Sequence, residues 1–114
     1  MSKQGMSEVR LVFCTFPDAG AARQIGTALV EKQLAACVNL IPGAESIYRW
    51  QGTVESAVEI VAIFKTTAAV YPEFERELAA LHPYDVPEIV AIEPAAVAET
   101  YASWLLSSAA PADR

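Results

Sequence analysis

The residues best suited to chemistry in this sequence are one cysteine, the single histidine and a glutamate shortly after it. Cys14 falls near the end of one apolar stretch, His82 follows a leucine-rich one, and Glu88 begins the next apolar run. A thiolate together with an imidazole suits Cu(I), Cu(II) or Zn(II), and a carboxylate can complete the ligand shell. No two of the three share a local metal-ligand motif, so a metal site depends on the fold bringing them together.

Each of these residues also has a structural interpretation. In the segment HPYDVPEI (82–89), a histidine in the last helical turn can bond free carbonyls, and the proline after it stops the helix. Cys14 is by default a small core residue, and so is Cys37 among its apolar neighbours. An acid–base site made of the paired carboxylates Asp85 and Glu88 is the weakest alternative, because a chain with 14 acids often places two of them close together.

Composition narrows the class of protein. At 114 residues the chain is expected to form one domain over 1–114, with an ordered core at about 8–108 and loose tails at 1–7 and 109–114. The net charge is −6 and the eight basic residues are scattered, which excludes a nucleic-acid partner. No run reaches the roughly 20 apolar residues that span a membrane, and the N-terminus lacks a secretory segment, so we predict no membrane partner and a cytoplasmic location.

Nucleotide-binding, nucleophile-elbow and metalloprotease motifs are also missing from the sequence. We therefore expect no enzyme and no organic cofactor.

Hydrophobic periodicity predicts the order of elements that must position the candidate residues. Strands are expected at 8–16, 36–50, 53–67 and 88–95, with a bulge at Pro42-Gly43, and helices at about 19–34, 71–81 and 97–108. This order is βαββαβ with a C-terminal helix, the ferredoxin-like split βαβ arrangement. It is an α+β fold in which two helices cover one face of a four-stranded antiparallel sheet. The first and fourth strands lie near one another in such a sheet, so the three candidate ligands can approach.

The apolar content predicts that subunits associate. The hydrophobic fraction is 54%, which is high for so small a domain. The strand at 53–67 is apolar on both faces by its middle, yet the helices of this fold cover only one of them. Copies of the chain are therefore expected to pack sheet against sheet around an axis.

Several segments resemble the CutA family of divalent-cation tolerance proteins. They are CTFPD at 14–18, EKQLAACVNLIPGAESIYRWQG at 31–52, KTT at 65–67, HPYDVPEI at 82–89 and YASWL at 101–105. The resemblance implies a homotrimer that acts in tolerance to divalent cations, copper in particular, with no established enzymatic reaction. Because the family's trimer is similar to PII-type signalling proteins, it also implies an alternative: a signalling or interaction module that binds a small molecule or a partner protein in clefts between subunits.

The resemblance also assigns residues. It implies that Cys14 and His82 are ligands of Cu(II) or another divalent cation such as Zn(II), with Glu88 near the same place. Leu81 stands where some relatives carry a second histidine, which leaves three ligands at most. The residues that fit the family pattern and are expected to line an inter-subunit cleft are Trp50, Lys65 and Tyr84.

Overall fold

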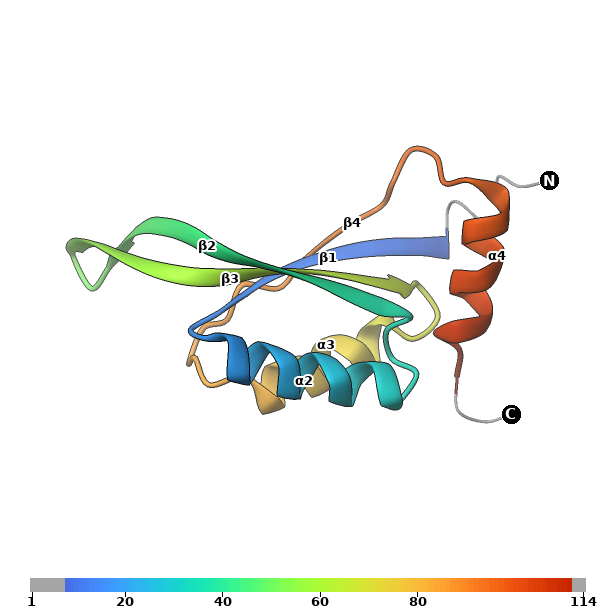
Figure 1. The fold of residues 1–114 in the computed structure, drawn as a ribbon, viewed down its shortest axis with the longest axis horizontal. Helices are drawn as coiled ribbons and strands as arrows, with labels where there is room; N and C mark the ends of the chain where they lie inside the picture. Colours follow the sequence, from blue (N-terminus) through green and yellow to red (C-terminus); the bar gives the residue numbers. More distant parts are fainter. Residues whose placement is uncertain (1–7, 112–114) are drawn as a thin grey trace.

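The structure is a computed structural model that describes residues 8–111. Its elements, in chain order, are β1 (Val9–Phe16), α2 (Ala19–Glu31), β2 (Cys37–Trp50), β3 (Thr53–Thr67), α3 (Tyr71–Leu81), β4 (Val90–Ile92) and α4 (Glu99–Ser108). The strands form one antiparallel sheet in the order β2-β3-β1-β4. Helices α2 and α3 lie on one face of it, and α4 lies at one end (Figure 1). The predicted α+β split βαβ fold is confirmed.

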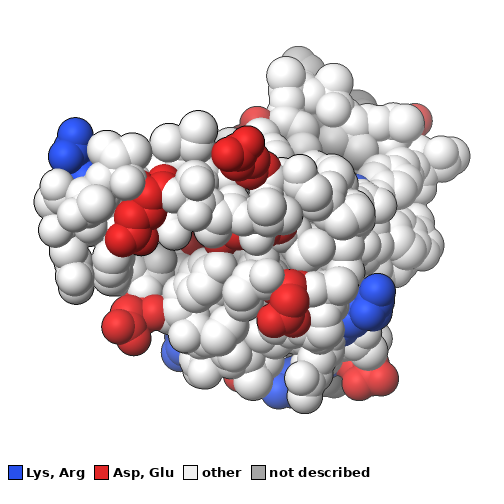
Figure 2. Space-filling model, turned by 60° about the vertical axis from the view of Figure 1, so that its left-hand side comes forward, with Lys and Arg blue, Asp and Glu red and all other residues white. Residues whose placement is uncertain are grey.

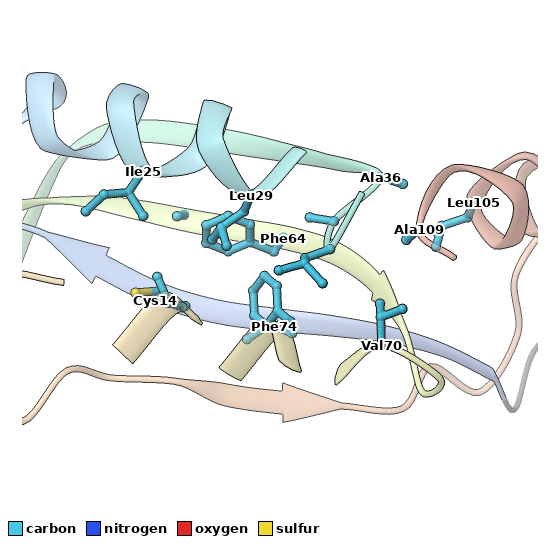
Figure 3. Close-up of a cluster of buried hydrophobic side chains, with 14 of the residues drawn as sticks. Cys14, Ile25, Leu29, Ala36, Phe64, Val70, Phe74, Leu105 and Ala109 are labelled. Carbon is cyan, nitrogen blue, oxygen red and sulfur yellow. The ribbon is translucent and has the colours of Figure 1, made fainter. Parts of the chain in front are cut away.

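The core lies between the sheet and helices α2 and α3. Alternate side chains of β1 and β3 point to the helices, and Cys14 and Phe64 are fully buried among them. Leu29 of α2 and Phe74 of α3 fill the same cluster (Figure 3). Phe64 and Phe74 meet edge to face, with ring centroids 5.1 Å apart. Burying each such large side chain contributes about 1.5–3 kcal/mol.

The opposite side of the sheet, here called the open face, has neither α2 nor α3 on it. By the strand register its middle part carries Leu11, Phe13, Thr15, Cys37, Asn39, Ile41, Val61, Ile63, Lys65, Val90 and Ile92. Ile41, Val90 and Ile92 expose between 43% and 50% of their surface. Most of these side chains are apolar, as the sequence predicted.

Helix α2 ends at Glu31, three residues earlier than predicted. Gln33 adopts a left-handed conformation, with φ of 60°. Its N–H donates to Val30 O, and the N–H of Leu34 donates to Leu29 O, both at 3.0 Å. These two bonds form a Schellman motif, which satisfies the last carbonyls and stops the helix.

Strand β4 covers only Val90–Ile92, whereas the sequence predicted 88–95. If the β1–β4 register continued, Glu88 would lie opposite Thr15. The carbonyl of Thr15 instead accepts a hydrogen bond from the ring of His82. A side chain from the end of α3 thus occupies the edge of β1 where the predicted strand would have paired.

Strands β2 and β3 form a long hairpin that extends past the helices (Figure 1). The predicted bulge is confirmed: the register shifts between Ile41 and Ala44, where Gly43 has φ of 82°. The turn at Gln51-Gly52 also has positive φ at both residues, which suits the twist of a hairpin.

The loose tails predicted at 1–7 and 109–114 lie largely outside the described residues. Ala109 itself is buried, and its carbonyl accepts a hydrogen bond of 2.8 Å from Thr67 Oγ1. Helix α4 is therefore fixed to the end of β3. Between residues 8 and 111, no helix is both long enough and apolar enough to cross a membrane.

Candidate functional site

His82 lies at the end of α3 and is 7% exposed. The backbone N–H of Tyr84 donates to its Nδ1 at 3.1 Å, which makes Nδ1 an acceptor. Nε2 must therefore carry the proton, and it donates to the carbonyl oxygen of Thr15 at 2.8 Å. The ring also stacks on Phe16, with centroids 4.8 Å apart and planes 18° apart.

These contacts join three parts of the fold through one imidazole. Residues 82–89 form the link between α3 and β4, and we call this link the corner. His82 ties the corner to the end of β1 through Thr15 and fixes its first turn through Tyr84. Both ring nitrogens are engaged with the backbone, so neither is available to a metal ion in this arrangement.

Cys14 lies on β1, one residue before Thr15, and points into the core (Figure 3). Burial raises the pKa of its thiol to about 12, and the negative charge of Glu88 adds to the rise. Its Sγ makes only a weak contact, 3.7 Å, with Thr15 O. A thiolate is the form that binds metal, so burial in the core opposes that role at neutral pH.

The fold therefore brings Cys14, His82 and Glu88 to the same end of β1, as predicted, but not into a ligand shell. Glu88 is exposed at the surface, whereas Cys14 is fully buried. Within residues 8–111, no group of three histidine, cysteine or acidic residues is arranged to hold a metal ion. As the subunit stands, these residues do not fit a divalent cation.

Tyr84 carries a second contact of the corner that sequence reasoning missed. Its hydroxyl donates to the carboxylate of Glu59, which is 8% exposed at the base of the hairpin. Burial, followed by this hydrogen bond, raises the pKa of the Tyr84 hydroxyl well above its usual range. The signal in the sequence was an acid just before the apolar middle of β3, a position where a buried carboxylate needs a partner.

Two of the three residues expected to line a cleft, Trp50 and Lys65, lie far apart within one subunit. Trp50 pairs with Thr53 at the tip of the hairpin. Lys65 is twelve residues farther along β3, a separation of about 40 Å in an extended strand. The chain itself measures 49 Å in its longest direction. A cleft that contains Trp50 and Lys65 therefore requires more than one copy of the chain.

Comparison with known proteins gives one consistent result. The family described as CutA1 divalent ion tolerance protein matches residues 10–108. The "Divalent-cation tolerance protein CutA" of Thermus thermophilus is 49% identical over 100 residues, which are 88% of this chain and 95% of that protein.

Two solved structures show the same fold. The crystal structure of CutA from Xylella fastidiosa has a TM-score of 0.88 at 40% identity, covering 91% of this chain and 100% of that one. The Cut A1 structure from Thermus thermophilus has a TM-score of 0.87 at 45% identity, covering 90% and 99%.

Proposed function

This chain belongs to the CutA1 divalent ion tolerance protein family, and from that premise we propose that it acts as a homotrimer in tolerance to divalent cations, copper in particular. Its role is to bind a ligand and not to catalyse a reaction. We also propose that it acts in the cytoplasm, where free thiols such as Cys14 and Cys37 are the usual state.

The observation that carries the assembly is the apolar surface of the projecting hairpin. Ile47 lies opposite Ser56, and Val54 and Val58 lie two residues to either side of Ser56 on the same face. Ile47 and Val58 are each 70% exposed, and Val54 is 60% exposed. Figure 2 turns the hairpin end toward the viewer and shows mostly uncharged atoms with a few separate charged groups. The same face also carries Arg49 opposite Val54 and Glu45 opposite Val58, so the three exposed apolar side chains have charged neighbours. Exposed apolar side chains rimmed by polar residues mark a protein–protein contact.

Replacing Val58 with glutamate tests the assembly. A charge in the centre of a buried contact is costly, so Val58→Glu is expected to lower the mass measured by light scattering from three subunits to one. Val86→Glu is the matched control, since Val86 is 73% exposed but lies on the corner. A trimer that survives Val58→Glu at micromolar concentration would contradict the proposed role of the hairpin.

For the cation, Cys14, His82 and Glu88 remain our proposal as ligands of Cu(II) or Zn(II). The support is that the three residues lie near the end of β1. The negative charge of Glu88 raises the pKa of the Cys14 thiol, and His82 forms a hydrogen bond with the carbonyl of Thr15, the residue after Cys14. Binding there requires His82 to release Thr15 or Tyr84, and Cys14 to lose its proton. The proposal thus includes a local rearrangement of the corner.

Calorimetry with Cu(II) and Zn(II) at neutral pH tests this site in the reduced protein. One metal ion per subunit is expected for the wild type, and its loss is expected in His82→Ala and Cys14→Ala. Cys37→Ala is the matched control, because it removes the other thiol and leaves the corner intact. Equal binding by the wild type and His82→Ala would show that the metal lies elsewhere.

A second function is favoured by the separation of Trp50 and Lys65, which only neighbouring copies of the chain can bring together. Here the trimer is a PII-like signalling or interaction module whose ligand binds in clefts between subunits, and the corner is structural. Both nitrogens of His82 are already satisfied, which supports this alternative. A thermal-shift screen is expected to find a small molecule that stabilises the trimer more than Cu(II) or Zn(II) does. Stabilisation by the metals alone would count against it.

A further inference from the structure

A small polar cluster interrupts the apolar open face near α4. Lys65 of β3 lies between Cys37 of β2 and Leu11 of β1 in the strand register. Its Nζ donates to Oδ1 of Asn39, two residues along β2 on the same face. From α4, the hydroxyl of Tyr101 lies 3.6 Å from Cys37 Sγ. We call Lys65, Asn39, Cys37 and Tyr101 the Lys65 cluster.

The cluster holds a positive charge without a negative one. Lys65 is the only charged residue among the open-face positions defined above, and the next position of that face along β3, Glu59, accepts a hydrogen bond from Tyr84. Within residues 8–111, the ion pair that meets a 4.0 Å limit joins Lys32 and Glu77, and no carboxylate lies that close to Lys65. An ammonium group has three donors, and only one of them is used by Asn39.

Tyr101 adds a donor to the same place. Its contact with Cys37 raises the pKa of the hydroxyl, and burial adds to the rise, so the proton stays on the oxygen. The ring is held in place by Trp104, with centroids 5.5 Å apart. The ammonium group of Lys65 and the hydroxyl of Tyr101 therefore both lie near Cys37. The neighbouring open-face residues Leu11 and Ile63 are apolar.

Association of the subunits makes this unpaired charge more costly. The side chain of Lys65 is already half-buried, and a second copy on the open face would bury it further. A buried ammonium is tolerated when a counter-charge accompanies it. A monoanion balances the one positive charge of Lys65. Because the surrounding side chains are apolar, they favour an organic anion with an apolar part over phosphate.

We propose that the Lys65 cluster binds the carboxylate of a small organic acid, whose apolar part lies against Leu11 and Ile63. Lys65 and Tyr101 donate to the carboxylate oxygens. The inference deepens the second proposed function, because it names the class of ligand for a cleft that contains Lys65. No covalent step is involved.

An NMR titration with benzoate tests the site directly. The chain has two tryptophans, Trp50 and Trp104, so the indole N–H region of the spectrum contains two signals, which Trp50→Phe assigns. Benzoate is expected to shift the Trp104 signal in a saturable way, because that ring contacts Tyr101. Benzamide, its neutral analogue, and inorganic phosphate are expected to shift it far less.

Variants then identify the residues responsible. Lys65→Met is expected to raise the Kd for benzoate roughly tenfold or more, the usual effect of losing a hydrogen bond to a charged group. Lys32→Met, which removes the lysine that directly follows α2, should leave the Kd unchanged. Tyr101→Phe is expected to weaken binding several-fold, and it provides the test if Lys65→Met does not fold.

Three results would overturn the inference. The first is a Kd for benzoate that is unchanged in Lys65→Met, and the second is benzamide binding as tightly as benzoate. The third is a trimer that dissociates in Lys65→Met, together with a wild type that does not bind benzoate. The last result would mean that a neighbouring copy supplies the carboxylate. Light scattering on the same samples measures the oligomeric state independently. A wild type that is monomeric but still binds benzoate would therefore contradict the proposed trimer without contradicting the proposed ligand site.

Discussion

Replacing His82 with alanine is expected to destabilise the fold whether or not a metal binds there. The variant loses the bond from Nε2 to Thr15 and the bond from the Tyr84 N–H to Nδ1. Each contributes about 0.5–1.5 kcal/mol net. The stack on Phe16 contributes about 0.5–1.5 kcal/mol more. The free energy of unfolding should therefore fall by about 3 kcal/mol.

Two further variants separate the two hydrogen bonds. His82→Gln can keep a donor near the position of Nε2 and loses the acceptor, whereas His82→Asn can keep an acceptor near Nδ1 and loses the donor. Each is expected to fall between the wild type and His82→Ala. If His82 only bound metal, His82→Gln and His82→Asn would be no better than His82→Ala, because neither amide is a strong metal ligand.

Urea unfolding followed by circular dichroism measures these differences. The samples need a chelator, so that bound metal cannot contribute, and a fixed subunit concentration, since association shifts apparent stability. Arg76→Ala, an exposed position on α3, is the control and should change stability by less than about 0.5 kcal/mol. If His82→Ala were as stable as this control, the structural account of the corner would be wrong.

Three other predictions follow from buried contacts. The pKa of Cys14 is raised from 9.0 to about 12, so the stability it contributes is present below pH 9 and lost between pH 9 and 12. Cys14→Ala should reduce the alkaline slope of the unfolding free energy by up to about 1.4 kcal/mol per pH unit, measured by urea titrations at several pH values. Tyr84→Phe leaves the buried carboxylate of Glu59 without its donor and should cost about 1.5–3 kcal/mol in urea unfolding, less when combined with Glu59→Gln. In Gly26→Ala the new Cβ would lie 3.1 Å from Cγ1 of Val38, so the melting temperature should fall despite better helix propensity, and Val38→Ala should reverse the loss.

Most of the fold was predictable because its signals are local. The β-forming residues of β1, the long apolar run of β3 and the helical spacing in α3 identify these elements from the sequence alone. The errors occur where the usual local signal is missing or where a distant contact decides. Helix α2 stops at a left-handed Gln33 instead of the glycine that usually marks such an end. Strand β4 is shortened by a hydrogen bond from His82, which lies eight residues before it.

The candidate site was predictable in position but not in chemistry. The strand order was enough to place Cys14, His82 and Glu88 at one end of β1. Spacing cannot reveal that Cys14 points into the core, or that backbone groups take both nitrogens of His82. The position of Glu59 beside the apolar middle of β3 indicates that it needs a partner, but Tyr84 is 25 positions away, so the sequence does not indicate which residue supplies it.

The two proposed functions make different demands on the corner. A metal ion that binds through His82 must break one of the two hydrogen bonds of the imidazole ring. That costs about 0.5–1.5 kcal/mol and raises the Kd for the metal by roughly two- to thirteenfold. A ligand at the Lys65 cluster breaks neither of these bonds, because the cluster and the corner share no residue. Metal binding at the corner should therefore loosen residues 82–89, whereas ligand binding at the cluster should leave them unchanged. Amide hydrogen exchange of Tyr84, whose N–H donates to His82, distinguishes the two: exchange that quickens with Cu(II) places the metal on Nδ1.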